Sequence, residues 1–143
     1  MKICIWITKI FDLGGTKRVV SLLANELVKE HEVTIMTYED RFREDRTMYH
    51  LSEDINVDFI DNSQFVNKHH TPAFCARYLV KKLNDRSGLF NKKSLNPILA
   101  EAIFSKKTRE KWVEYFNSQD YDVILTTASL SLRLAMIAPR LKA

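Results

Sequence analysis

Two of the chain's three glycines, Gly14 and Gly15, are adjacent and follow a short apolar run. Glycines ahead of a helix let backbone N–H groups approach a phosphate closely, and the helix dipole favours the anion. A tight strand-to-helix turn also needs glycine for structural reasons alone. We favour phosphate binding at Gly14, Gly15 and Thr16, because ligands of open α/β sheets lie at the carboxyl ends of strands.

The glycine pair matches neither common nucleotide-binding motif. The dinucleotide fingerprint would require glycines where Leu13, Lys17 and Arg18 stand, and the Walker A pattern is absent. Lys17 and Arg18 oppose the helix dipole at the start of the predicted helix, which carries a small cost. They suit either a nearby anionic ligand or a solvated surface, and the sequence leaves both interpretations open.

Hydroxyl and acidic side chains follow two other predicted strands. Thr126, Thr127 and Ser129 come at the end of the last strand, where they either donate hydrogen bonds into the same crevice or cap the next helix. Glu39 and Asp40 follow the second strand, at the position of a ribose-binding acid. Because the surrounding stretch is highly charged, a solvated loop is the favoured interpretation for these two acids.

The remaining candidates favour ordinary surface roles. His69 and His70 are adjacent in a polar segment and have no metal-ligand spacing. The basic run 106–111 is more typical of a solvated helix face than of a nucleic-acid or anionic-lipid patch. No set of acids, nucleophile and base, or metal ligands is suitably spaced within one element. The sequence therefore assigns no catalytic residue, no metal and no cofactor.

Residue periodicity predicts the elements that position these residues. Runs of β-branched and apolar residues predict strands over 3–7, 32–38, 56–61 and 122–127. Helical spacing predicts a helix between the first two strands and another over 130–138, and the Thr71-Pro72 and Asn96-Pro97 pairs predict two helix starts. The first helix carries a buried stripe expected at Val20, Leu23, Ala24 and Leu27, widened by Val19 and Leu22.

This order of elements predicts a Rossmann-like, doubly wound α/β fold. The sheet is expected to be mostly parallel, with strand order 3-2-1-4 between two helix layers. The 143 residues fit one domain, 1–143, with 45% hydrophobic and 28% charged residues. A net charge of +4 is too small to argue for nucleic acid. The sequence ends where such a sheet would receive its next strand, so we expect a truncated sheet and self-association of the isolated domain.

Residues 14–27 and 31–35 resemble the start of a family-4 glycosyltransferase of the GT-B fold. The shared patterns are a G-G-x-x-R-V loop, L-A-x-x-L in the helix, and H-E-V-T entering the second strand. Residues 121–125 agree with the family's fourth strand, and residues 39–120 match only in layout. Relatives commonly carry a histidine after the fourth strand, whereas this chain has Thr126 to Ser129, so no catalytic residue is carried over.

The resemblance implies a two-domain enzyme of which this chain is the N-terminal, acceptor-side half. In that family a C-terminal domain, absent here, holds the nucleotide-sugar and an E-x7-E motif, and the glycine loop meets the donor's phosphates. Transfer is retaining and usually metal-independent, and the products are cell-surface glycans and glycolipids. We therefore expect the isolated domain to be inactive.

The sequence also indicates a compartment and leaves one alternative function. Cys4 and Cys75 suit a reducing environment, and neither a signal peptide nor a membrane span is apparent. We expect a cytoplasmic protein, with peripheral contact at the inner membrane face implied by the resemblance. The alternative is a stand-alone nucleotide- or phosphate-binding module that acts through protein contacts.

Overall fold

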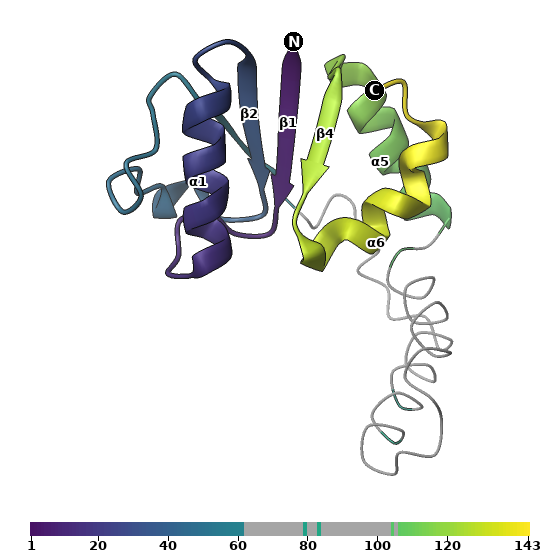
Figure 1. Ribbon diagram of the computed structural model, residues 1–143. Coiled ribbons are helices and arrows are strands. Elements are labelled where there is room, and N and C mark those ends of the chain that lie inside the picture. The colour runs from purple at the N-terminus through teal and green to yellow at the C-terminus, as the bar shows by residue number, and fades with distance from the viewer. Residues whose placement is uncertain (62–78, 80–82, 84–103, 105) are drawn as a thin grey trace.

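The computed structural model describes residues 1–61, 79, 83, 104 and 106–143 (Figure 1). The helix starts predicted at Pro72 and Pro97 lie outside the described residues, and so do His69, His70 and Cys75.

The centre of the molecule is a four-stranded parallel sheet in the order β3-β2-β1-β4, which confirms the predicted class and strand order. The strands are β1 (Lys2–Ile7), β2 (Glu32–Thr37), β3 (Asn56–Phe59) and β4 (Val123–Thr126). In register, Ile5 of β1 lies beside Ile35 of β2 and Leu125 of β4. Five of the six β1 residues are buried, as expected for a strand enclosed on both faces of a parallel sheet.

Helices connect the strands on both sides of the sheet. The longer ones are α1 (Gly15–Leu27), α5 (Lys106–Gln119) and α6 (Ala128–Ile137). Two short 3-10 turns, η1 (Arg41–Arg43) and η2 (Ala138–Arg140), follow β2 and α6. Within the described residues, no helix is both long and apolar enough to cross a membrane.

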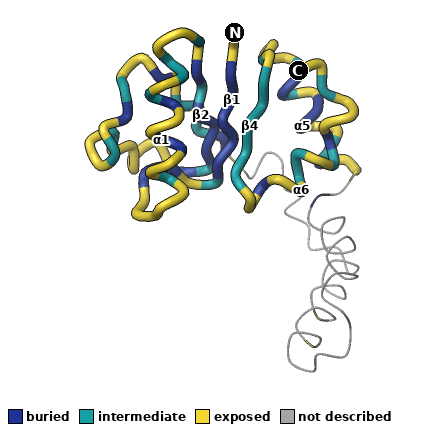
Figure 2. Tube along the Cα trace, viewed as in Figure 1, coloured by how far each residue is buried: buried dark blue, intermediate teal, exposed yellow. Residues whose placement is uncertain are grey.

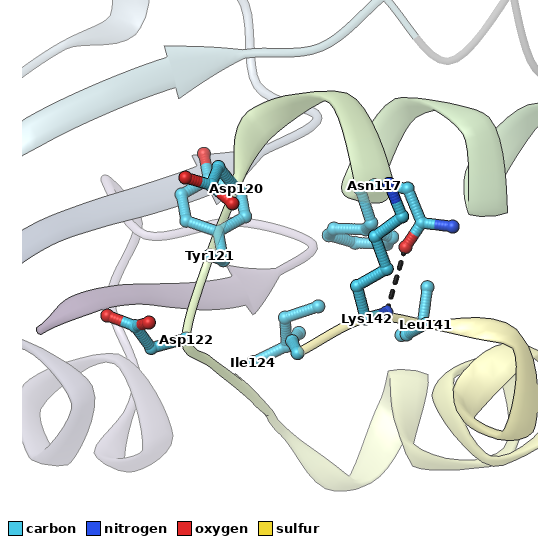
Figure 3. A pocket seen from close by; sticks show the side chains of 9 residues that line it. Asn117, Asp120, Tyr121, Asp122, Ile124, Leu141 and Lys142 are labelled. Carbon is cyan, nitrogen blue, oxygen red and sulfur yellow. Dashed lines mark hydrogen bonds between the residues drawn. The ribbon is translucent and has the colours of Figure 1, made fainter.

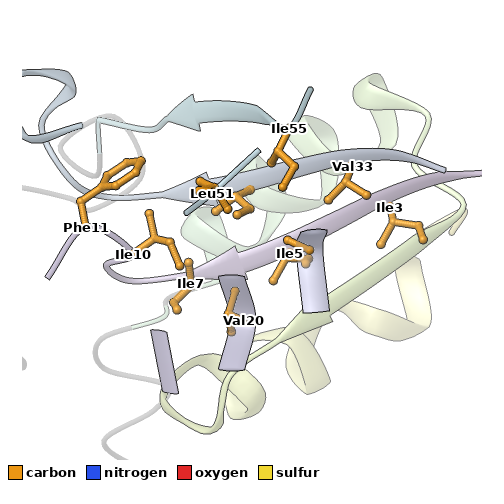
Figure 4. Close-up of a cluster of buried hydrophobic side chains, with 11 residues drawn as sticks. Ile3, Ile5, Ile7, Ile10, Phe11, Val20, Val33, Leu51 and Ile55 are labelled. Atoms are coloured by element: carbon orange, nitrogen blue, oxygen red, sulfur yellow. The ribbon is translucent and has the colours of Figure 1, made fainter. Parts of the chain in front are cut away.

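The side chains of β1 pack alternately into two separate hydrophobic cores, one on each face of the sheet. The domain is therefore a three-layer α/β/α structure. Ile3, Ile5 and Ile7 pack on the α1 side with Val20 and Ala24 (Figure 4). Cys4 and Trp6 pack on the opposite side, with aromatic and aliphatic residues of the other two helices: Trp112, Phe116, Leu130 and Ile137. Figure 2 shows the resulting pattern, in which the central strands are buried and the outer surfaces of the helices are largely exposed.

The buried stripe of α1 is narrower than the sequence predicts. Val20 and Ala24 are buried, but Val19, Leu22 and Leu23 are 64%, 56% and 43% exposed. A helix presents only one side to a flat sheet, and residues 19, 22 and 23 lie beyond that contact. The expectations that Leu23 belongs to the buried stripe and that Val19 and Leu22 widen it are therefore wrong.

The β4 side of the sheet is less covered than its centre. Within the described residues β4 pairs only with β1, and all four of its residues are half-buried. On α6, Leu132 is 51% exposed whereas Ile137 is fully buried. Self-association through this edge stays a prediction.

A group of titratable side chains lies between the sheet and α5. The Tyr115 hydroxyl donates a hydrogen bond to the Asp58 carboxylate. Burial, with a smaller contribution from Asp58, raises the pKa of the Cys4 thiol to about 12. Burial also raises the pKa of Tyr121 to about 12 and is the main cause of the raised pKa of Tyr115.

These raised pKa values predict loss of stability in alkali. In alkali the folded chain keeps protons that the unfolded chain releases. The free energy of unfolding should therefore stay nearly constant below pH 9 and fall as the pH rises toward 12. Urea unfolding at pH 8 and pH 10.5 measures the difference, and Cys4→Val should reduce it by removing one of these groups. A transition midpoint that stays constant or rises between the two pH values would contradict the prediction.

Candidate functional site

The topology brings two connections together at the carboxyl edge of the sheet. β1 and β4 are neighbours, yet the chain leaves β1 for α1 on one face and leaves β4 for α6 on the other. In Figure 1 both helices begin at the end of the sheet to which the arrows point. Such a reversal of winding direction is where ligands of open α/β sheets bind.

The glycine loop supplies hydrogen-bond donors to this edge. Gly14 is the N-cap of α1 and Gly15 is its first residue. Within the described residues no side chain or carbonyl accepts from the N–H groups of Gly15, Thr16 and Lys17, and the first turn contains no acid. These three amides, with the positive end of the helix dipole, can bind an anion.

The fold itself does not account for glycine at position 15. A Cβ atom added to Gly15 would meet no heavy atom within 4 Å, and its backbone is helical without a positive φ. At Gly14 the added Cβ would lie 3.3 Å from Cδ of Lys17, a side chain that can move. The structure therefore gives no steric or conformational reason for glycine at position 15.

Lys17 and Arg18 have different surroundings. The Lys17 ammonium lies 3.2 Å from Oδ2 of Asp12 and donates to the Leu13 carbonyl at 3.1 Å, so it braces the loop. Its hydrogen bond, followed by one from the Leu13 amide, holds the pKa of the Asp12 carboxyl below its usual value. Arg18 is exposed beside the loop. Of the two cations, Arg18 is the one oriented to solvent.

The hydroxyl residues after β4 are partly engaged within the fold. The Thr126 hydroxyl donates to the Trp6 carbonyl at 2.9 Å and so ties β4 to β1. Thr127 occupies the N-cap of α6 but makes no capping bond with its side chain, which instead lies 3.1 Å from the Ser129 hydroxyl. Thr127 and Ser129 thus stand at the edge of the site, while Thr126 serves the sheet.

Glu39 holds the start of the glycine loop. Its side chain is only 8% exposed, and Oε2 accepts hydrogen bonds from the N–H groups of Ile10 at 2.6 Å and Phe11 at 2.8 Å. The interpretation of Glu39 as part of a solvated loop is therefore wrong, because these two amides hold it inside the fold. Asp40 is exposed, as expected, and accepts from the Phe42 amide to cap η1.

The segment 39–55, which begins with Glu39, is attached at two further points. Tyr49 bonds it to the glycine loop, and Asn25 bonds it to α1. The Tyr49 hydroxyl accepts from the Gly14 amide at 2.9 Å. The Asn25 amide group donates to the His50 carbonyl and accepts from the Ser52 N–H, both at 2.9 Å. Sequence reasoning missed both residues. The one available signal was Asn25 itself, a residue disfavoured in the middle of a helix unless its side chain has a partner.

Among the described residues, one cavity lies at the carboxyl end of the sheet and another at its amino end. One of about 470 Å³ lies at the carboxyl ends of β2 and β3, and the Arg41 guanidinium stands 5.9 Å from the Phe59 ring beside it. Its lining residues are Tyr38, Glu39, Asp40, Arg41, Phe59, Ile60 and Asp61. The other, of about 150 Å³, lies near Asn117 and Asp122 at the amino end of β4 (Figure 3). Only the first shares the carboxyl edge with the glycine loop.

The other sequence candidates do not join this site. Within the described residues no group of three or more acids, histidines and cysteines is arranged to hold a metal ion. The basic run at the start of α5 is mostly exposed, with Thr108 buried within it, which fits the solvated helix face favoured from the sequence.

Comparison with known proteins adds no relative to this description. No protein-family model matches the chain, and neither a curated protein nor a solved structure matches it.

Removing the Glu39 carboxylate should destabilise the domain. Glu39→Ala leaves the Ile10 and Phe11 amides buried without an acceptor, which we expect to cost about 2–4 kcal/mol of unfolding free energy. Asp40→Ala is the matched control, because that neighbouring acid is exposed and caps one short turn, so about 1 kcal/mol or less is expected. Chemical denaturation gives both values, and hydrogen exchange should show faster exchange of the two amides only in Glu39→Ala. Equal losses in the two variants would contradict the role assigned to Glu39.

Proposed function

We propose that this chain is the acceptor-side N-terminal domain of a nucleotide-sugar-dependent glycosyltransferase of the GT-B type. The enzyme would transfer a sugar to a glycan or glycolipid during synthesis of cell-surface polysaccharide, at the cytoplasmic face of the membrane. The observation that carries the proposal is the set of amides at Gly15, Thr16 and Lys17, which have no partner within the described residues and lie at the switch point. The structure also gives no steric reason for glycine at position 15. The sequence resemblance over residues 14–35 supports the same function.

In this proposal the three amides act by electrostatic stabilisation of the leaving group. When a sugar leaves its nucleoside diphosphate, negative charge develops on the diphosphate oxygen that had been bonded to the sugar. Preoriented N–H groups at a helix N-terminus stabilise such charge without reorganising. Gly15 suits this role because no side chain keeps the diphosphate away from the backbone. A second domain would hold the rest of the donor, and this chain contributes no assigned catalytic residue.

The cavity beside Arg41 and Phe59 suits the acceptor. Carboxylates such as Asp40 accept hydrogen bonds from sugar hydroxyl groups, and an aromatic ring packs against the apolar face of a sugar. Because this cavity lies at the same edge of the sheet as the glycine loop, an acceptor there would approach the donor from the β2–β3 side.

A stand-alone nucleotide- or phosphate-binding module is the second candidate. It is favoured by the same anion-binding amides together with the absence, within the described residues, of an assigned catalytic pair. The two candidates share the phosphate site and differ in whether a sugar is transferred.

Amide NMR titration tests the phosphate site. We expect inorganic pyrophosphate or uridine diphosphate to shift the amide signals of Gly15, Thr16 and Lys17 at millimolar concentrations. Gly15→Val should weaken binding at least about tenfold, because its branched side chain would occupy the space the ligand needs, while the melting temperature stays nearly unchanged. Gly15→Ala is the graded control, with a smaller loss of affinity. Undiminished binding in Gly15→Val would contradict the assignment of the loop.

Enzyme assays separate glycosyl transfer from simple binding. The purified chain, incubated with a nucleotide-sugar and acceptor, should release no nucleoside diphosphate above background, because the proposal places most of the donor site in a second domain. Sustained turnover by these 143 residues would contradict the division of labour proposed here.

A further inference from the structure

We infer that Tyr49 is a positioning residue for the phosphate site, an inference that rests on the proposed function of the glycine loop. Its hydroxyl accepts a hydrogen bond from the N-cap amide of α1 and adds no negative charge beside the proposed anion site. Three features of the described residues carry this: the missing cap, the fixed position of Tyr49, and the neutrality of its side chain.

The N-terminus of α1 lacks the residues that usually close it. Gly14 at the N-cap has no side chain, so it cannot accept from the second or third amide of the helix. In a capping box the third helical residue is Glu or Gln and accepts from the N-cap amide, but here it is Lys17, which can only donate. The Gly14 N–H therefore needs an acceptor from elsewhere, and Tyr49 provides it at 2.9 Å.

The chain fixes the Tyr49 hydroxyl relative to α1. One and three residues after Tyr49, His50 and Ser52 are bonded to the side chain of Asn25 in the middle of that helix. Arg46 donates to the carbonyls of Ser52 and Ile55 and closes the segment from its other side. Leu51 and Ile55 are buried in the α1-side core. The helix and the segment thus hold each other at two points, Gly14 and Asn25.

The choice of a hydroxyl has an electrostatic consequence. A carboxylate at this point would satisfy Gly14 and favour the helix dipole, but it would repel a diphosphate bound to the next three amides. The Tyr49 hydroxyl, which also lies 3.3 Å from the Asp12 carbonyl, orients the loop and remains neutral. Tyr49 thereby keeps the Gly15, Thr16 and Lys17 amides aligned and free for phosphate esters.

The test measures pyrophosphate affinity in Tyr49→Phe. Loss of the hydroxyl leaves Gly14 without its acceptor and loosens the loop, so the dissociation constant for inorganic pyrophosphate should rise about three- to tenfold. Tyr121→Phe is the matched control, because Tyr121 precedes β4 at the amino edge of the sheet. The pyrophosphate affinity of this variant should equal that of the unmodified chain. Asn25→Ala releases the Tyr49-bearing segment without touching Gly14 and should weaken binding in the same direction, which keeps the inference testable if Tyr49→Phe fails to fold.

The outcomes separate this inference from the proposed function. A lower melting temperature with unchanged pyrophosphate affinity in Tyr49→Phe would make Tyr49 merely structural and overturn the inference, leaving the phosphate site in place. An equal loss of affinity in Tyr121→Phe would also overturn it. If pyrophosphate shifts no amide of Gly15, Thr16 or Lys17 in the unmodified chain, both the phosphate site and the role of Tyr49 are wrong.

Discussion

The hydrogen bonds from Ile10 and Phe11 to the buried Glu39 carboxylate determine where the chain goes after the central strand. β1 is enclosed on both faces, so the loop that leaves it begins in a region where amides without partners are costly. Glu39 follows the neighbouring strand β2 and therefore couples the loop to the sheet itself. The chain continues from that attachment to the glycines and the start of α1.

The partners of the remaining loop amides define what the loop can bind. Leu13 donates to the Asp12 side chain, and Gly14 donates to Tyr49. Within the described residues the amides of Gly15, Thr16 and Lys17, in the first turn of α1, have no partner. These three donors lie together at the start of α1, at the carboxyl end of the sheet (Figure 1). The proposed phosphate site depends on these donors more directly than on the glycines alone.

The sequence predicted the sheet well because the information is local. Runs such as Ile3 to Ile7 are apolar on both faces, which identifies a central parallel strand, and the glycine turn identifies the crossover to a helix. Where the sequence misled, the missing information was tertiary. Glu39 and Asp40 are adjacent acids in one charged stretch, and only the path of the β1 loop makes one buried and the other exposed. Likewise, the apolar pattern of α1 does not indicate how much of the helix the sheet covers. The pattern therefore predicts that Leu22 is part of the buried stripe, whereas it is exposed.

The connection that follows β1 and the connection that follows β4 present different hydrogen-bonding groups at the switch point. After β4 the hydroxyls are engaged: Thr126 bonds to the Trp6 carbonyl, and Thr127 pairs with Ser129 at the start of α6. After β1 the helix start is bare, since Gly14 and Gly15 have no side chains and Lys17 is folded back onto Asp12. A ligand at the proposed site would therefore meet backbone donors on the α1 side and hydroxyls on the α6 side. The two sides of the edge thus differ in chemistry, with backbone N–H donors at the start of α1 and side-chain hydroxyls at the start of α6.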